Sequence, residues 1–132
     1  MSYPGGRIGG MVRGRIVAES LRPGAALVVP GLEATRVSRV SVSAPAAGQP
    51  PIWTLLDVTA PDERAEELAA ALSAALAADG GWYADFRVGA AHVVVFAGRI
   101  FRYEVGDAAG REQAVAYGRS VGVPEAQLDW GP

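Results

Sequence analysis

Residues 82–105 have the sequence WYADFRV-GA-AHVVVFA-GR-IFRYEV, three apolar stretches separated by two pairs of residues. Each pair, Gly89 with Ala90 and Gly98 with Arg99, places glycine at the first position of a two-residue connection. This is the pattern of a type II′ β-hairpin, in which the first turn residue has a positive φ. The stretch therefore predicts three antiparallel strands, over residues 82–88, 91–97 and 100–105.

Successive side chains of a strand point to opposite faces, so the two turns also assign the side chains to faces. Two-residue turns pair position 87 with 92, 97 with 100, 94 with 103 and 92 with 105. We expect one face to be the core that packs on a helix, and it carries Trp82, Ala84, Phe86, Val88, Val93, Val95, Ala97 and Ile100. The other face carries Tyr83, Asp85, Arg87, His92, Val94, Phe96, Phe101, Tyr103 and Val105.

Two helices are predicted around this meander. Residues 61–78 begin with proline and four acidic side chains, which suit a helix N-terminus, and Gly80 and Gly81 follow them. Their apolar residues recur at steps of three and four, at Ala65, Leu68, Ala69, Leu72, Ala75 and Leu76. The second helix is expected to follow Asp107 as N-cap and to end at Gly122, with Leu128 and Trp130 buried beyond it.

The N-terminal half predicts three further strands, over residues 15–21, 33–43 and 52–58, with a β-bulge near Arg39. The element order is then βββ-α-βββ-α. We expect an α+β fold with a single, mainly antiparallel sheet and both helices packed on one face. Residues 1–11 are rich in glycine and predict a flexible N-terminal arm, whereas residues 12–132 form a single α+β domain.

Composition limits the chemistry that the chain can perform. The 132 residues include 12 basic side chains, all of them arginine, against 14 acidic ones, for a net charge of −2. The basic residues form no continuous stripe, which disfavours a nucleic-acid partner. With no cysteine and one histidine, disulfides, thiolate sites and multi-histidine metal sites are excluded, and no cofactor is expected. No apolar stretch suggests a membrane span or a signal peptide, so we expect a cytoplasmic protein.

One group of residues could carry chemistry. His92 is expected opposite Arg87, with Asp85 as a diagonal neighbour. Imidazole, carboxylate and phenol groups can hold and protonate a substrate, so His92, Asp85 and Tyr103 are candidate catalytic residues. Arg87 and Tyr83 are candidate ligand-binding residues. The simpler interpretation is favoured, in which Asp85 and Arg87 form an ion pair on a wet sheet face and His92 is an ordinary edge residue.

Three segments resemble short bacterial proteins that have no assigned activity: residues 82–86 (WYADF), 93–101 (VVVFAGRIF) and 117–130 (YGRSVGVPEAQLDW). The resemblance covers roughly the C-terminal half of the chain. It implies a small bacterial cytosolic domain and transfers no functional residue.

Two hypotheses about function follow from the sequence. The leading one is a non-catalytic protein-interaction or binding module, with a homodimer or a protein partner docked on an uncovered sheet face bearing Val94, Phe96 and Phe101. The alternative is a small enzyme or anionic-ligand binder that uses His92 with Asp85, Arg87 and Tyr103. An imidazole whose titration responds to an added ligand would favour the alternative.

Overall fold

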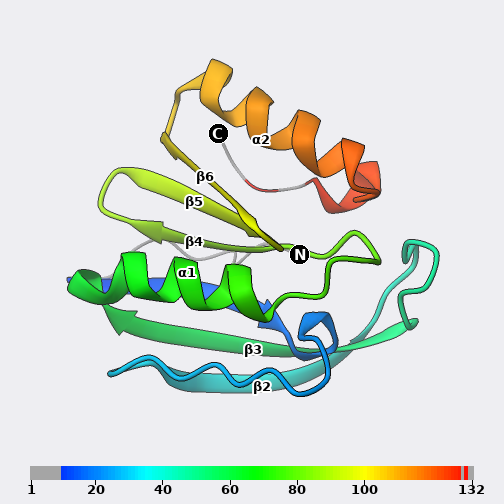
Figure 1. Ribbon diagram of the computed structural model, residues 1–132, viewed down its shortest axis with the longest axis horizontal. Helices are drawn as coiled ribbons and strands as arrows, with labels where there is room; N and C mark the ends of the chain where they lie inside the picture. Colours follow the sequence, from blue (N-terminus) through cyan, green and yellow to red (C-terminus); the bar gives the residue numbers. More distant parts are fainter. Residues whose placement is uncertain (1–9, 129, 131–132) are drawn as a thin grey trace.

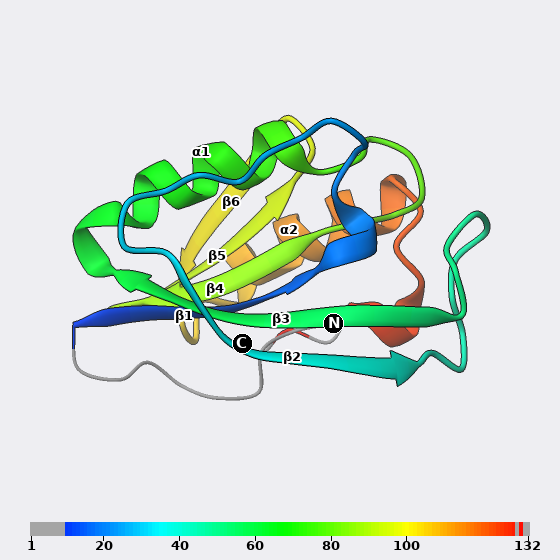
Figure 2. The same ribbon diagram turned by 90° about the horizontal axis from the view of Figure 1, so that it is seen from below.

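The computed structural model describes residues 10–128 and 130, and in them one six-stranded antiparallel sheet lies between two helices (Figures 1 and 2). The strands are arranged in the order β2-β3-β1-β4-β5-β6. This confirms the α+β class, the single antiparallel sheet and the order βββ-α-βββ-α. The elements are β1 (Met11–Val17), β2 (Glu33–Ser41), β3 (Ile52–Pro61), α1 (Ala65–Ala75), β4 (Ala84–Val88), β5 (Ala91–Phe96), β6 (Arg99–Glu104) and α2 (Ala108–Ser120).

The first hairpin has the predicted register, and the second is shifted. Val88 pairs with Ala91, and Gly89 has a φ of +57° at the first turn position. In the second hairpin Phe96 pairs with Arg99, so the turn residues are Ala97 and Gly98. Gly98 has a φ of +73° at the second turn position, where a type II turn requires glycine. The shift moves the partner of His92 from position 105 to Tyr103.

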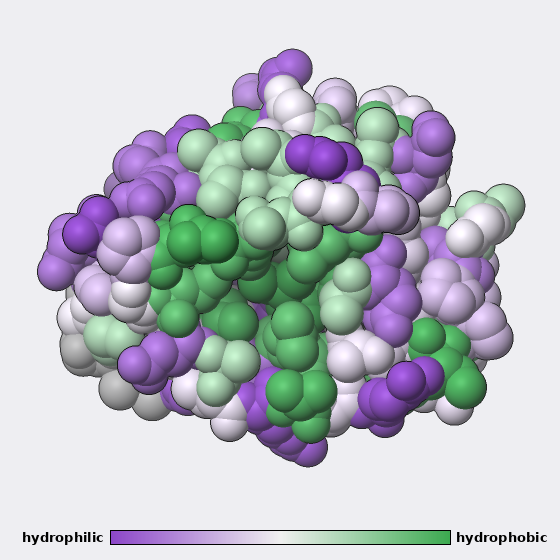
Figure 3. Space-filling view, turned by 60° about the horizontal axis from the view of Figure 1, so that its bottom comes forward, coloured by the Kyte–Doolittle hydropathy of each residue, from purple (hydrophilic) through white to green (hydrophobic). Residues whose placement is uncertain are grey.

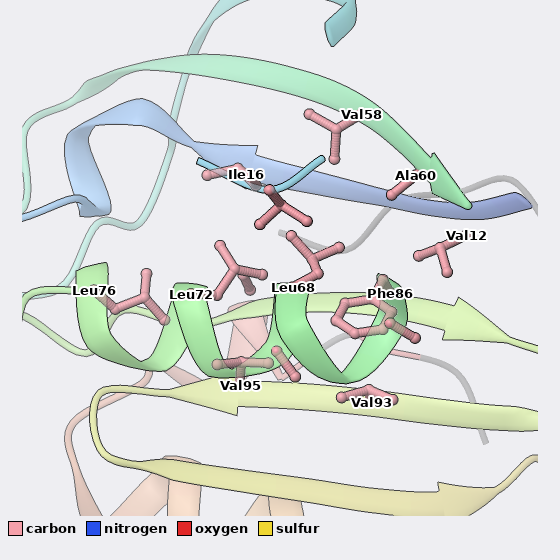
Figure 4. Close-up of a cluster of buried hydrophobic side chains, with 14 residues drawn as sticks. Val12, Ile16, Val58, Ala60, Leu68, Leu72, Leu76, Phe86, Val93 and Val95 are labelled. Carbon is pink, nitrogen blue, oxygen red and sulfur yellow. The ribbon is translucent and has the colours of Figure 1, made fainter. Parts of the chain in front are cut away.

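The two helices pack on opposite faces of the sheet, so the expectation that both lie on one face is wrong. Leu68 and Leu72 of α1 face Phe86, Val93 and Val95 in one cluster, on the face predicted to be the core (Figure 4). On the other face, Ala114 and Val115 of α2 belong to a separate cluster that includes Val94, Phe96 and Tyr103. The physical reason is that β5 is apolar on both faces, and each face needs a cover.

Strand β1 starts earlier than expected. It spans Met11–Val17, at the centre of the sheet between β3 and β4, and the chain then turns through a 3-10 helix at Ala18–Ser20. Gly14 permits the close approach of β4, since a Cβ there would lie 3.0 Å from the backbone oxygen of Asp85 and 3.0 Å from Cβ of Phe86. Met11, assigned to the expected arm, is thus a strand residue, and residues 1–9 lie outside the described part of the chain.

The connection from β1 to β2 runs across the side of the sheet that α1 covers (Figure 2). It contains two proline–glycine turns, Pro23-Gly24 and Pro30-Gly31. The amide of Ala25 donates to the carbonyl of Arg22 and that of Leu32 to the carbonyl of Val29, at 3.1 Å each. In β2 the bulge falls between Ala34 and Arg36, and not near Arg39.

Helix α1 is shorter than the helix predicted over residues 61–78. A 3-10 turn at Asp62–Arg64 precedes it, and it ends at Ala75 because Leu76 is extended and pairs with Leu21. In the described part of the chain, no helix is long and apolar enough to cross a membrane.

The C-terminal segment is buried, as predicted, and it packs on the face that α2 covers. The Asp107 carboxylate caps α2 by accepting from the amide of Gly110 at 3.1 Å. Gly122 has a φ of +94° beyond the helix, and the amide of Val123 donates back to Gly118. After a 3-10 turn at Glu125–Gln127, Leu128 and Trp130 are buried, Trp130 with 1 % exposure.

Replacing Trp130 with alanine should destabilise the fold severely. The indole ring packs edge-on against Tyr83 and Phe96, and large-to-small changes at buried aromatic residues cost about 3–5 kcal/mol. Guanidinium denaturation of Trp130→Ala, followed by circular dichroism, measures the loss. Val105→Ala is the control, because Val105 is exposed and should change stability by about 0.5 kcal/mol or less. Equal midpoints for both variants would contradict a structural role of the C-terminal segment.

Candidate functional site

The three candidate catalytic residues form a hydrogen-bonded chain across the strands β4, β5 and β6. His92 Nε2 lies 2.7 Å from Oδ2 of Asp85, and His92 Nδ1 lies 2.7 Å from the hydroxyl of Tyr103. Tyr103 is the cross-strand partner of His92, whereas Asp85 is diagonal to it, since Asp85 pairs with Val94. The structure therefore brings His92, Asp85 and Tyr103 together. The alternating pattern predicted that they share a face, whereas the predicted register placed Val105, and not Tyr103, across from His92.

All three side chains are buried. The exposed fractions are 0 % for His92, 3 % for Asp85 and 5 % for Tyr103. A neutral imidazole satisfies both contacts when its hydrogen lies on Nε2 and is donated to the carboxylate, while the phenol hydroxyl donates to Nδ1. A catalytic residue has to touch a substrate, and these groups instead touch one another beneath the layer that α2 forms. The hydrogen bonds of the cluster therefore hold β4, β5 and β6 in position relative to one another.

Burial also keeps the phenol neutral. Desolvation raises the pKa of Tyr103 to about 12, against smaller opposing effects of the Arg111 and Arg87 charges, and Asp85 adds to the increase. A phenol with a raised pKa stays protonated and serves as a hydrogen-bond donor. Activation of a tyrosine as nucleophile or base requires the opposite shift.

A row of alternating charges continues from this cluster toward β2. Cross-strand pairing places Arg15 between Asp57 on β3 and Asp85 on β4. Arg15 donates to both carboxylate oxygens of Asp57, at 2.7 and 3.3 Å. In the next row Arg87 is the cross-strand partner of His92 and of Arg13, so the predicted position of Arg87 opposite His92 is correct. The described residues show no ion pair between Asp85 and Arg87, which the simpler interpretation expected.

Tyr83 has a structural role. Its hydroxyl donates to the carbonyl of Gln127 at 2.6 Å, and its ring contacts Trp130 and Phe96. The contacts tie the end of the chain to the sheet, and they occupy the polar atom that a ligand would use.

The sheet face proposed as an interface is covered. Val94 and Phe96 are 0 and 2 % exposed, and Phe96 packs against Phe101 and Tyr117, the latter from α2. Arg99 stacks over the rings of Phe101 and Tyr117 at the margin of this cluster. The expectation that Val94, Phe96 and Phe101 form an open docking face is wrong, because α2 and the C-terminal segment fill it.

Other features were not predicted from the sequence. Gln49 and Gln127 are buried and hydrogen-bonded to each other at 3.2 Å, and Gln49 also donates to the carbonyl of Gly80. A cavity of about 170 Å³ opens beside them, between the β2–β3 connection and the C-terminal turn. Its lining residues include Val42, Ala44, Trp53 and Gln127. Within the described residues, no group of three or more His, Asp or Glu side chains could hold a metal ion.

Comparison with protein-family models, with curated proteins and with solved structures gave no match in any of the three.

Removing the hydroxyl of Tyr103 should destabilise the protein without unfolding it. Tyr103→Phe leaves the buried Nδ1 of His92 without this donor, which costs about 1–3 kcal/mol. Urea denaturation gives the free energy of unfolding. Tyr117→Phe is the matched control, because Tyr117 contributes ring contacts and should lose about 0.5 kcal/mol or less. Equal stability of Tyr103→Phe and the parent would show that the chain of hydrogen bonds contributes nothing.

The raised pKa of Tyr103 also predicts a loss of stability in alkali. Between the ordinary tyrosine pKa of 10.0 and the folded value of about 12, the folded protein keeps a proton that the unfolded chain releases. Stability from this group is complete below pH 10.0 and disappears as the pH rises through about 12. Absorbance titration at a phenolate wavelength should show one late-titrating tyrosine that Tyr103→Phe removes. A late step that persists in this variant would assign the shift to another tyrosine.

Proposed function

We propose that the protein is a non-catalytic protein-interaction module of the bacterial cytosol, which binds an extended segment of a partner protein along the outer edge of β2. The observation that carries the proposal is that β2 combines an unpaired edge with exposed side chains. The burial of His92, Asp85 and Tyr103 removes the main support for an enzyme, and the covering of Val94 and Phe96 removes the docking face first considered.

Among the described strands, β2 has a neighbour on one side alone. It is the first strand in the sheet order and pairs with β3, from Glu33 to Ser41. The amide of Val42 donates to the carbonyl of Pro51, so the antiparallel ladder directs the backbone groups of Val40, Ser38 and Arg36 toward β3. The N–H and C=O groups of Val37, Arg39 and Ser41 consequently point outward. Outward-pointing groups of this kind are the template for addition of a further strand.

The side chains around this edge are exposed and partly apolar. Among large hydrophobic residues of the described chain, Val28 and Val37 have the highest exposed fractions, 80 and 63 %. Figure 3 turns β2 and the segment 21–32 forward, and a hollowed apolar surface extends between them. The partly buried residues Leu27, Leu32 and Leu56 adjoin the core below this surface. Exposed apolar surface beside a free strand edge supports binding of a polypeptide.

The opposite edge of the sheet differs. Strand β6 is six residues long, against nine for β2, and α2 lies alongside it (Figure 1). Short or covered edges are protected from strand addition. The β2 edge is thus the better site for a partner.

Proline at position 39 tests the proposal. Arg39→Pro removes an outward N–H and leaves the β2–β3 ladder intact, so the variant should fold, whereas Ser38→Pro removes a ladder donor and should lose stability. Peptides selected on the parent protein from a random library displayed on phage are the probe. At least one synthetic peptide should bind Arg39→Pro roughly tenfold more weakly than Arg39→Gln in fluorescence anisotropy, since both variants lack the charge and the proline variant alone lacks the donor.

The comparison has two informative outcomes. Weaker binding by Arg39→Pro than by Arg39→Gln, with equal melting temperatures, supports strand addition at β2. If every selected peptide binds the two variants equally, the β2 edge is not the binding site and the proposal fails.

A further inference from the structure

Resting on the proposed function, we propose that the partner segment is acidic: it places an apolar side chain beside Val37 and carboxylates beside Arg36 and Arg39. Three features support this partner. They are the positive charge of the regular β2 stretch 36–41, the hydrogen bonds that already engage the nearest carboxylates, and the sheet faces on which the side chains of Arg36, Val37 and Arg39 lie.

The regular stretch of β2, residues 36–41, is positively charged. The bulge between Ala34 and Arg36 interrupts the ladder, which separates Glu33 from the regular stretch 36–41. This stretch contains Arg36 and Arg39, both exposed, and no acidic residue. A strand added here therefore meets two guanidinium groups within four residues.

The nearest carboxylates are already engaged by other groups. Asp57, the cross-strand partner of Arg36, accepts both hydrogen bonds from Arg15. Burial alone would raise the pKa of Glu19, but hydrogen bonds from the amide of Thr54 at 2.6 Å and from its hydroxyl at 2.8 Å lower it, and the Arg39 charge lowers it a little further. Within the described residues, the guanidinium groups of Arg36 and Arg39 form no ion pair and no hydrogen bond. Both groups keep donors for a partner's carboxylates.

The pairing with β3 gives the faces. Val37 pairs with Leu56 and Arg39 with Thr54, so both side chains lie on the face that α1 covers, where Leu56 packs against the core. Arg36 pairs with Asp57 and lies on the other face. An antiparallel partner would therefore have the order acidic, any, apolar, acidic, and a parallel partner the reverse order. Carboxylates three positions apart on a strand point to opposite faces, as Arg36 and Arg39 do.

A second copy of this chain does not supply these groups. Its own stretch 36–41 carries the same two arginines, so pairing of two β2 strands would gather four guanidinium groups along one edge. Like charges directly across a sheet are destabilising. The charge pattern thus favours an acidic partner over a homodimer joined through β2.

Charge reversal tests the inference with the phage-selected peptides as probes. We expect selection on the parent protein to enrich Asp or Glu three positions apart, with an apolar residue between them. Arg36→Glu combined with Arg39→Glu should weaken binding of such a peptide roughly tenfold or more, and a peptide with lysine in place of both acids should bind the reversed variant better than the parent. Arg64→Glu, an exposed reversal next to α1, is the matched control and should leave binding unchanged.

The outcomes separate this inference from the proposed function. Peptides that require the Arg39 amide but carry no acid would overturn the acidic partner and leave strand addition standing. A dimer in sedimentation velocity that Arg39→Pro dissociates would identify a second copy as the occupant and would also overturn it. If no peptide distinguishes Arg39→Pro from Arg39→Gln, the proposed function itself fails.

Discussion

Burial of β5 on both faces is the constraint on which the rest of the structure depends. Val93 and Val95 pack under α1, while Val94 and Phe96 pack under α2. A strand that is apolar on both faces forces the chain to place a layer on each side of the sheet. The same burial encloses His92, which comes from this strand and would be a costly polar group without its two hydrogen bonds. The polar cluster is thus a consequence of the position of β5.

Local patterns predicted the elements and much of the site. Alternation along β4 and β5, with Gly89 at a turn, determines that Asp85, Arg87 and His92 share a face, and the structure confirms it. Their burial was not predictable in the same way. It depends on α2, whose position follows from which sheet face has no other cover, and that is a property of the whole fold.

The register of the second hairpin shows the limit of turn patterns. Ala97-Gly98 and Gly98-Arg99 both place a glycine in a two-residue turn, and the two choices differ by two positions in pairing. Because a shift of two keeps every side chain on its face, hydrophobic alternation cannot distinguish them. The choice decides whether Tyr103 or Val105 lies across from His92, and therefore whether the imidazole has a phenol partner.

The edge position of β2 was the hardest feature to predict from the sequence, since it depends on the order of the strands in the sheet. Residues 33–41 alternate like any half-buried strand, but their position outside β3 leaves them exposed. Two features protect this edge from pairing with itself: the bulge at Ala34–Arg36 shortens the regular stretch, and arginines repel a second copy. Neither feature repels an acidic segment, since the outward amides remain and the charges attract it. On the proposed function, a strand edge that resists self-association and still offers backbone donors would select its partner by charge.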